Sequence, residues 1–236
     1  MAGRAEGLEQ LVSRKVDGII LMGSTFVEEN DEDNAYIRQA AEKLPIVILN
    51  ATLAAENVYG VIGDQERTSA EAVKALIDSG CQRILYLYHS QNHNGRKKLA
   101  GYRDALTRAG IAIDEALIRF IPEDAVSVPA VRDTLEELYS GGLRFDAVFT
   151  SEDELAAGAI KFANSRGLKI PEDISIIGYN NTPSCLFTEP ELSSVDVKLQ
   201  SICRESVRVL LSVLNGQEAP QTTVFAGSLI RRGSTR

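Results

Sequence analysis

The stretch GLKIPEDISIIGYNNT (residues 167–182) shows most directly how this chain folds. Gly167 stands where a helix is expected to end, because glycine readily adopts the left-handed conformation that closes many helices. A polar turn follows, then the apolar run Ile174–Ile177, and then the pair Asn180 and Asn181. A short, continuous apolar run between turn residues is typical of a strand that is covered on both faces. The stretch therefore predicts a helix end, a buried strand and a polar strand end, in that order.

The same alternation extends along most of the chain. Other short aliphatic runs predict strands, at residues 18–22, 45–49, 84–88, 117–121 and 147–149. Apolar residues with helical spacing predict helices around 70–77, 155–163 and 197–214, followed by glycines at 80, 167 and 216. Strands that alternate with helices in this way predict right-handed βαβ crossovers and mostly parallel sheets. We expect two α/β lobes with a cleft between them, joined near the polar run 89–94 and the turn-rich run 188–194.

Composition and charge exclude several classes of protein. The 236 residues include 25 lysines and arginines against 33 aspartates and glutamates, a formal net charge of −8. Such a chain is not expected to grip DNA, RNA or an anionic membrane unaided, because that binding depends on basic side chains. No apolar run approaches the roughly 20 residues that a membrane crossing needs. The N-terminus does not resemble a secretory signal, and the three cysteines are far apart in sequence, so we expect a cytoplasmic protein without disulfides.

Motifs of catalysis are missing from the sequence. It contains no GxGxxG, GxxxxGK[ST] or GxSxG motif, so neither a phosphate-binding loop nor a nucleophile elbow is indicated. His89 and His93 are four residues apart, but no HExxH motif or nearby cysteine completes a metal site, which favours a surface or cleft-rim pair. We therefore expect no enzymatic activity, no cofactor and no metal.

Acidic and amide side chains follow several expected strands, which is where an α/β sheet places its ligands. They are Asn50, Asp64, Glu152, Asp153, Asn180 and Asn181. Each also has a purely structural interpretation. Asp64 suits a helix N-cap, Ser151–Glu154 matches the S-x-x-E capping box, and paired asparagines suit a left-handed turn. Their convergence at four strand ends favours a ligand site.

Residues 167–182 also strongly resemble the effector-binding core of LacI/GalR-family transcriptional regulators, in which this run reads "GL.VPeDisvvGyDdt". Further similar stretches occur in the family's order, at residues 16–20, 44–50, 75–85, 99–106 and 147–158. The C-terminal IRRGST (230–235) resembles the family's ending, "l..R.St". The resemblance spans nearly the whole chain. It implies an α/β, type I periplasmic-binding-protein-like fold, with two doubly wound αβα lobes and a small effector in the central cleft.

The resemblance also implies which residues contact the effector. The family's aspartate after the fourth strand is retained as Asp64. Its arginine becomes Lys98, with Arg96 nearby as a substitute, although lysine lacks the bidentate fork of arginine. The remaining implied contacts are Glu152 and Asp153 for the family's Asn-Asp pair, and Asn180 for its aspartate. An aromatic residue that some members use for stacking is Ala125 here. These departures favour altered specificity for a sugar, a sugar derivative or a purine-like effector.

The family resemblance further implies that a DNA-binding part lies outside this sequence. Family members begin with a helix-turn-helix, a hinge helix and a strand-helix-strand passage before the segment that matches residues 6–18. We therefore expect an incomplete first lobe, with a gap between the strands at 18–22 and 84–88. The expected lobes comprise residues 1–89 plus 195–222, and residues 90–194 plus 223–236.

The function that this resemblance implies is the effector-binding and dimerisation core of a bacterial LacI-type regulator. A ligand would change the angle between the lobes and so control DNA binding allosterically through the missing helix-turn-helix. The partners are then a small effector and a second copy of the chain, with no membrane. The long helix at 197–214 is buried within one chain or partly at the dimer contact. The alternatives are a solute-binding receptor of a sugar ABC transporter and a doubly wound enzyme.

Overall fold

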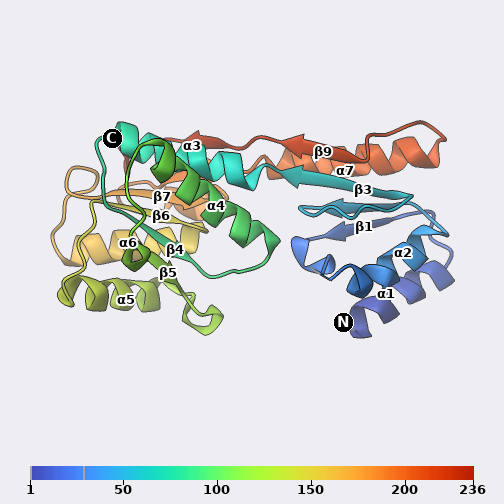
Figure 1. Ribbon diagram of the computed structural model, residues 1–236, viewed down its shortest axis with the longest axis horizontal. Helices are drawn as coiled ribbons and strands as arrows, with labels where there is room; N and C mark the ends of the chain where they lie inside the picture. Colours follow the sequence, from blue (N-terminus) through green and yellow to red (C-terminus); the bar gives the residue numbers. More distant parts are fainter. Residues whose placement is uncertain (1, 29) are drawn as a thin grey trace. The chain divides into compact units, whose positions relative to one another are not determined.

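The computed structural model describes residues 2–28 and 30–236, which form two compact units, each built on one sheet (Figure 1). The first unit comprises Met1–Asp64 and Lys198–Phe225, and the second comprises Gln65–Val197 and Ala226–Arg236. The chain therefore passes between the units three times, as the two-lobed fold requires. None of the helices within the described ranges is long and apolar enough to cross a membrane.

The first unit has a four-stranded parallel sheet in the order β1-β2-β3-β9. Its strands are β1 (Ile19–Met22), β2 (Ile46–Leu49), β3 (Val58–Gly63) and β9 (Thr222–Phe225), and its helices are α1 (Ala2–Ser13), α2 (Ala35–Ala41) and α7 (Leu199–Leu214), with short 3-10 turns at Ser24–Phe26 and Asp31–Asn34. Alternating residues of β2 face opposite sides of the sheet. Ile46 and Ile48 pack with residues of α1 and α2, whereas Val47 and Leu49 pack with residues of α7. All four are buried, which explains the continuous apolar run.

The second unit has a six-stranded sheet in the order β10-β8-β7-β6-β4-β5, parallel except for β10. Its strands are β4 (Ile84–Tyr88), β5 (Ile118–Phe120), β6 (Ala147–Thr150), β7 (Ser175–Tyr179), β8 (Ser193–Asp196) and β10 (Ser228–Ile230). Its helices are α3 (Gln65–Asp78), α4 (His93–Arg108), α5 (Val128–Ser140) and α6 (Asp153–Ser165), with 3-10 turns at Glu115–Leu117, Glu123–Ala125 and Pro183–Leu186. Along β4, Ile84 and Tyr86 pack with α3 and α4, whereas Leu85 and Leu87 pack with α5 and α6.

The predicted strands and helices are confirmed with small shifts at their ends. Gly80, Gly167 and Gly216 follow α3, α6 and α7 with φ angles of +97°, +68° and +72°, so all three act as the expected helix stops. The polar run 89–94 is only partly a loop, because α4 begins at His93. Asn92 is the N-cap of that helix and accepts a hydrogen bond from the Gly95 N–H at 2.9 Å.

The boundary between the units differs from the expected lobes. The sequence analysis places residues 65–89 in the first lobe, but the structure places them in the second unit. The reason is strand pairing, since β4 lies between β6 and β5. The predicted gap beside residues 84–88 is wrong for the same reason, because β4 has a paired strand on each side. In the first sheet, β1 pairs with β2, and within residues 2–28 and 30–236 no strand pairs with the other edge of β1.

Candidate functional site

Polar residues of the second unit gather at the carboxyl ends of three neighbouring strands. β7, β6 and β4 are adjacent and parallel, so the residues that follow them lie at one edge of the sheet. These residues are His89 after β4, Ser151 to Asp153 after β6, and Asn180 to Thr182 after β7. Lys98 reaches the same edge from α4, because its Nζ donates a hydrogen bond to the Ser151 carbonyl at 2.9 Å. We call Lys98, Glu152, Asp153 and Asn180 the polar edge.

Lys98 supplies the positive charge of the polar edge. Its Nζ lies 4.0 Å from the centroid of the Tyr179 ring, a favourable cation–π arrangement. Burial lowers the pKa of Lys98 from 10.5 to about 8, and the negative charges of Glu152 and Asp153 oppose this shift. At neutral pH the ammonium group therefore remains largely protonated and can donate further hydrogen bonds.

Glu152 presents its carboxylate to the neighbouring strand end. Its Oε1 lies 2.6 Å from Nε2 of His89, and its side chain keeps 36% of its surface exposed. Glu152 occupies the N-cap position of α6 without a side-chain cap hydrogen bond. The predicted Ser151–Glu154 capping box is therefore wrong. Ser151 is not the N-cap, and its buried hydroxyl has no hydrogen-bond partner among the described residues.

Asp153 differs from its neighbour because it is buried, with 2% of its surface exposed. Its Oδ2 accepts hydrogen bonds from the backbone N–H and the hydroxyl of Thr182, at 2.7 and 2.8 Å. Its Oδ1 accepts one from the Ser194 hydroxyl at 2.5 Å. Asp153 therefore holds the segment that follows β7 against β8 and the start of α6.

Asn180 and Asn181 form a left-handed turn at the end of β7. Their φ angles are +97° and +49°, which confirms the turn interpretation of this pair. The Asn180 N–H donates to the Val195 carbonyl at 2.9 Å, and the Asn181 N–H donates to the Ser194 hydroxyl at 3.0 Å. Asn180 is exposed and follows β7 directly, so it lies at the strand ends that form the polar edge.

Asp64 belongs to the first unit, whereas Arg96 and Ala125 belong to the second. Asp64 ends the first unit after β3, where its N–H donates to the Phe225 carbonyl at 2.9 Å. Arg96 is exposed on α4, and its Nη1 donates to the Gln91 carbonyl at 2.7 Å. Ala125 packs against the core of the second unit. Within the second unit, the structure therefore brings together four of the five predicted effector contacts, and Lys98 rather than Arg96 supplies their cation.

Two residues that the sequence analysis did not select, Tyr179 and Gln65, connect Lys98 of the polar edge to α3. The Tyr179 hydroxyl donates to Oε1 of Gln65 at 2.7 Å, and both side chains are buried. This bond joins the end of β7 to the first residue of α3 across 114 positions of sequence. No local sequence pattern signals a contact over that separation.

Comparisons with known proteins agree with the fold. The model of the periplasmic binding protein-like domain matches residues 73–235. An HTH-type transcriptional regulator of Lachnoclostridium phytofermentans is 40% identical over 97% of this chain and 68% of its own length. A solved sugar-binding transcriptional regulator of the LacI family from Escherichia coli, complexed with phosphate, has a TM-score of 0.84 at 30% identity, covering 98% of this chain and 81% of that one. This chain belongs to the LacI/GalR family.

Membership of the LacI/GalR family confirms the fold expected from residues 167–182. The regulator AscG of Escherichia coli is 31% identical over 97% of this chain and 66% of its own length. The chain thus spans about two thirds of the length of the curated relatives it matches. The fold is a periplasmic-binding-protein-like α/β fold with two parallel-sheet units, and these relatives are regulators rather than enzymes.

Proposed function

We propose that the polar edge binds a small polyhydroxylated effector, a sugar or sugar derivative, and that this binding regulates transcription. The observation that carries the proposal is that Lys98 lies near Glu152 at the end of β6, while the exposed Asn180 follows the adjacent strand β7. A carboxylate accepts hydrogen bonds from sugar hydroxyls, an ammonium group donates to their oxygens, and an amide does both. A related regulator of known structure is named as sugar-binding, which supports this ligand class.

An exposed aromatic ring provides a second feature suited to a sugar. Phe120 is 44% exposed at the end of β5, the strand next to β4. Its ring packs edge-on against Tyr88, with the ring centroids 5.4 Å apart. In this proposal the free face of Phe120 contacts the apolar face of a sugar ring, the task expected of the aromatic residue that Ala125 replaces.

The proposed regulator acts on DNA through a helix-turn-helix supplied outside these residues, as its relatives' names indicate. Effector binding then shifts the balance between two conformations of the full-length protein. This function requires a cytoplasmic protein. The relatives, which are named as transcriptional regulators, favour it over a solute-binding receptor of a sugar transporter.

The proposed regulator is a homodimer. Leu186 and Phe187 of the second unit are 54% and 83% exposed, and large exposed apolar side chains mark interaction surfaces when they adjoin each other. Phe187→Asp is expected to convert the dimer to a monomer in light scattering coupled to gel filtration. Val224→Asp, at an exposed position of the first unit outside α7, is the matched control. A dimer that survives Phe187→Asp would remove this surface from the proposal.

A thermal-shift screen tests the effector site directly. The compounds are D-glucose, D-ribose, cellobiose, glucose 6-phosphate and adenine, so that a purine would also be detected. A ligand at 100 times its Kd stabilises by about 2.7 kcal/mol, which raises Tm by about 5–10 °C for a chain of this size. Glu152→Gln and Asn180→Ala are each expected to weaken binding at least about tenfold, since each removes about 1.5 kcal/mol of hydrogen bonding. Arg96→Met is the control on α4.

The result that would overturn the proposal is a stabilising compound whose affinity is the same in the native chain, Glu152→Gln and Asn180→Ala. Stabilisation by adenine alone, lost in both variants, would keep the polar edge and replace the sugar by a purine as the ligand class.

A further inference from the structure

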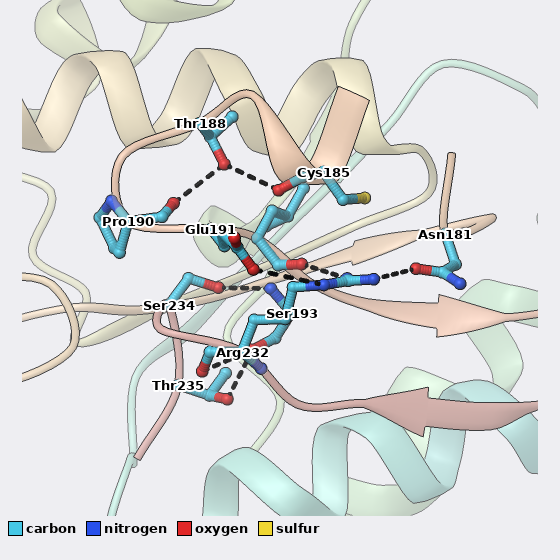
Figure 2. Close-up of polar contacts among 10 residues, drawn as sticks. Asn181, Cys185, Thr188, Pro190, Glu191, Ser193, Arg232, Ser234 and Thr235 are labelled. Atoms are coloured by element: carbon cyan, nitrogen blue, oxygen red, sulfur yellow. Dashed lines mark hydrogen bonds and ion pairs between the residues drawn. The ribbon is translucent and has the colours of Figure 1, made fainter. Parts of the chain in front are cut away.

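Arg232 is a nearly buried cation whose hydrogen bonds go to neutral groups. Its side chain is 15% exposed. Nη1 donates to the Leu192 carbonyl at 2.6 Å, and Nη2 donates to Oδ1 of Asn181 at 2.7 Å (Figure 2). The Glu191 carboxylate lies 4.0 Å from Nε and is largely exposed. The guanidinium group is therefore oriented by fixed hydrogen-bond geometry more than by ion pairing.

The backbone around Arg232 is fixed to two strands of the second sheet. The Arg232 N–H donates to the Ser193 hydroxyl at 2.7 Å, and the Ser193 N–H donates to the Ser234 hydroxyl at 2.8 Å. The Ser234 hydroxyl in turn donates to the Ile176 carbonyl of β7 at 2.6 Å. Figure 2 shows Arg232 reaching from this anchored segment to Asn181. The direction of the guanidinium group is thus set before it meets the turn.

Arg232 contacts the turn that contains Asn180, through its hydrogen bond to the side chain of Asn181. Both Asn180 and Asn181 have left-handed φ angles, which non-glycine residues rarely adopt in succession. Three neighbours hold this conformation. Ser194 of β8 accepts the Asn181 N–H, Asp153 of α6 accepts both donors of Thr182, and Arg232 donates to the Asn181 side chain.

We propose that Arg232 is a positioning residue of the effector site, which keeps the turn at residues 179–182 in the conformation that presents Asn180. This inference rests on the proposed function for its link to an effector. The positioning itself is a property of the free protein. It gives the C-terminal segment a role beyond closing the sheet. Arg232 and Asn181 are 51 positions apart, so their hydrogen bond is a tertiary contact and not a local capping pattern.

Amide hydrogen–deuterium exchange in the free, full chain tests the positioning. Arg232→Met is expected to speed exchange at Asn180, Asn181 and Thr182 by about 10- to 100-fold. The lost hydrogen bond to a charged group raises the equilibrium constant for local opening of the turn by about that factor. Arg231→Met is the matched control, since Arg231 is exposed and donates to the Arg236 carbonyl. It is expected to leave exchange at the turn unchanged.

Two further variants separate positioning from simple anchoring. Asn181→Ala removes the same hydrogen bond from the other side, so Arg232→Met added to it should accelerate exchange at Thr182 no further. Arg232→Lys should restore part of the protection, because an ammonium group can still donate to one of the two acceptors. Asn181→Ala also keeps the test available if Arg232→Met does not fold.

The inference would be overturned if Arg232→Met accelerated exchange only at Ser193 and Ser234, since Arg232 would then anchor the C-terminal segment alone. Equal acceleration in Arg231→Met would overturn it as well. Because no sugar is present, these outcomes are independent of the sugar screen. Failure of the screen with altered exchange would refute the effector site and keep the positioning role.

Discussion

Replacing Asp153 by alanine should destabilise the second unit strongly, although sequence reasoning makes this residue a ligand contact. The carboxylate is 2% exposed and accepts three hydrogen bonds. The Thr182 hydroxyl keeps a partner without Asp153, because it also contacts Ser184 Oγ at 2.7 Å. The Ser194 hydroxyl accepts the Asn181 N–H but has no second oxygen or nitrogen acceptor for its own proton among the described contacts. The backbone N–H of Thr182 has no such second partner among the described contacts.

The magnitude follows from this difference. An unsatisfied buried donor costs about 1–3 kcal/mol, and Asp153→Ala leaves two of them, the Thr182 N–H and the Ser194 O–H. Asp153→Ala should therefore lower the free energy of unfolding by about 3–5 kcal/mol. Asp153→Asn should cost only about 1 kcal/mol, because its oxygen can accept from Thr182 while its NH2 group donates to the Ser194 hydroxyl.

Urea unfolding followed by tyrosine fluorescence measures these losses. The chain has no tryptophan and seven tyrosines, and five of these lie in the second unit, so the signal reports mainly on that unit. Glu152→Ala is the matched control on the adjacent, exposed carboxylate, and it should cost less than about 1 kcal/mol. A loss below about 1 kcal/mol in Asp153→Ala, or equal losses in the alanine and asparagine variants, would refute the reasoning.

Two further predictions use the same unfolding assay. The pKa of Lys98 is about 8 in the folded state and 10.5 in the unfolded state, so the folded state binds fewer protons between these values and is stabilised as pH rises through them. The stability of the native chain relative to Lys98→Met should therefore increase by about 1–3 kcal/mol from pH 7 to pH 10.5, and a flat difference would contradict the burial of the ammonium group. Gly178→Ala should cost about 1–3 kcal/mol, because its Cβ would lie 2.4 Å from Asp153 Oδ1 and 2.9 Å from Leu192 Cδ2. An unchanged midpoint in Gly178→Ala would show that Asp153 does not pack against β7.

The sequence predicts the elements of this fold better than their grouping. Runs such as Ile84–Tyr88 are apolar throughout because both faces of the sheet are covered, and that covering is visible from composition alone. The sheet to which such a run belongs is decided by pairing with a distant partner, here Ala147–Thr150. Two buried strands with the same pattern are interchangeable at the level of sequence, which is why residues 65–89 are assigned to the wrong side of the boundary.

For the candidate site too, the sequence predicts where residues lie but not the contacts that hold them. Position after a strand correctly predicts that Glu152 and Asn180 lie at one edge of the second sheet, and the family pattern adds Lys98. Sequence cannot reveal the bonds that hold this edge in place. Arg232 meets Asn181 over 51 positions and Gln65 meets Tyr179 over 114, so neither pair leaves a local pattern.

The adjacent carboxylates Glu152 and Asp153 show what this arrangement permits. Glu152 is the N-cap of α6 and faces His89, whereas Asp153 is enclosed by Thr182 and Ser194. In the proposed effector site, a change at Glu152 would alter the charge offered to the effector at little cost in stability, whereas a change at Asp153 would disturb the turn that contains Asn180. Under the proposed function, ligand preference can therefore change through Lys98, Glu152 and Asn180 while the hydrogen bonds of Asp153 and Arg232 stay constant. The departures of this chain from the family pattern at Lys98, Glu152 and Asn180 fall on that variable side, which favours an altered effector on a retained scaffold.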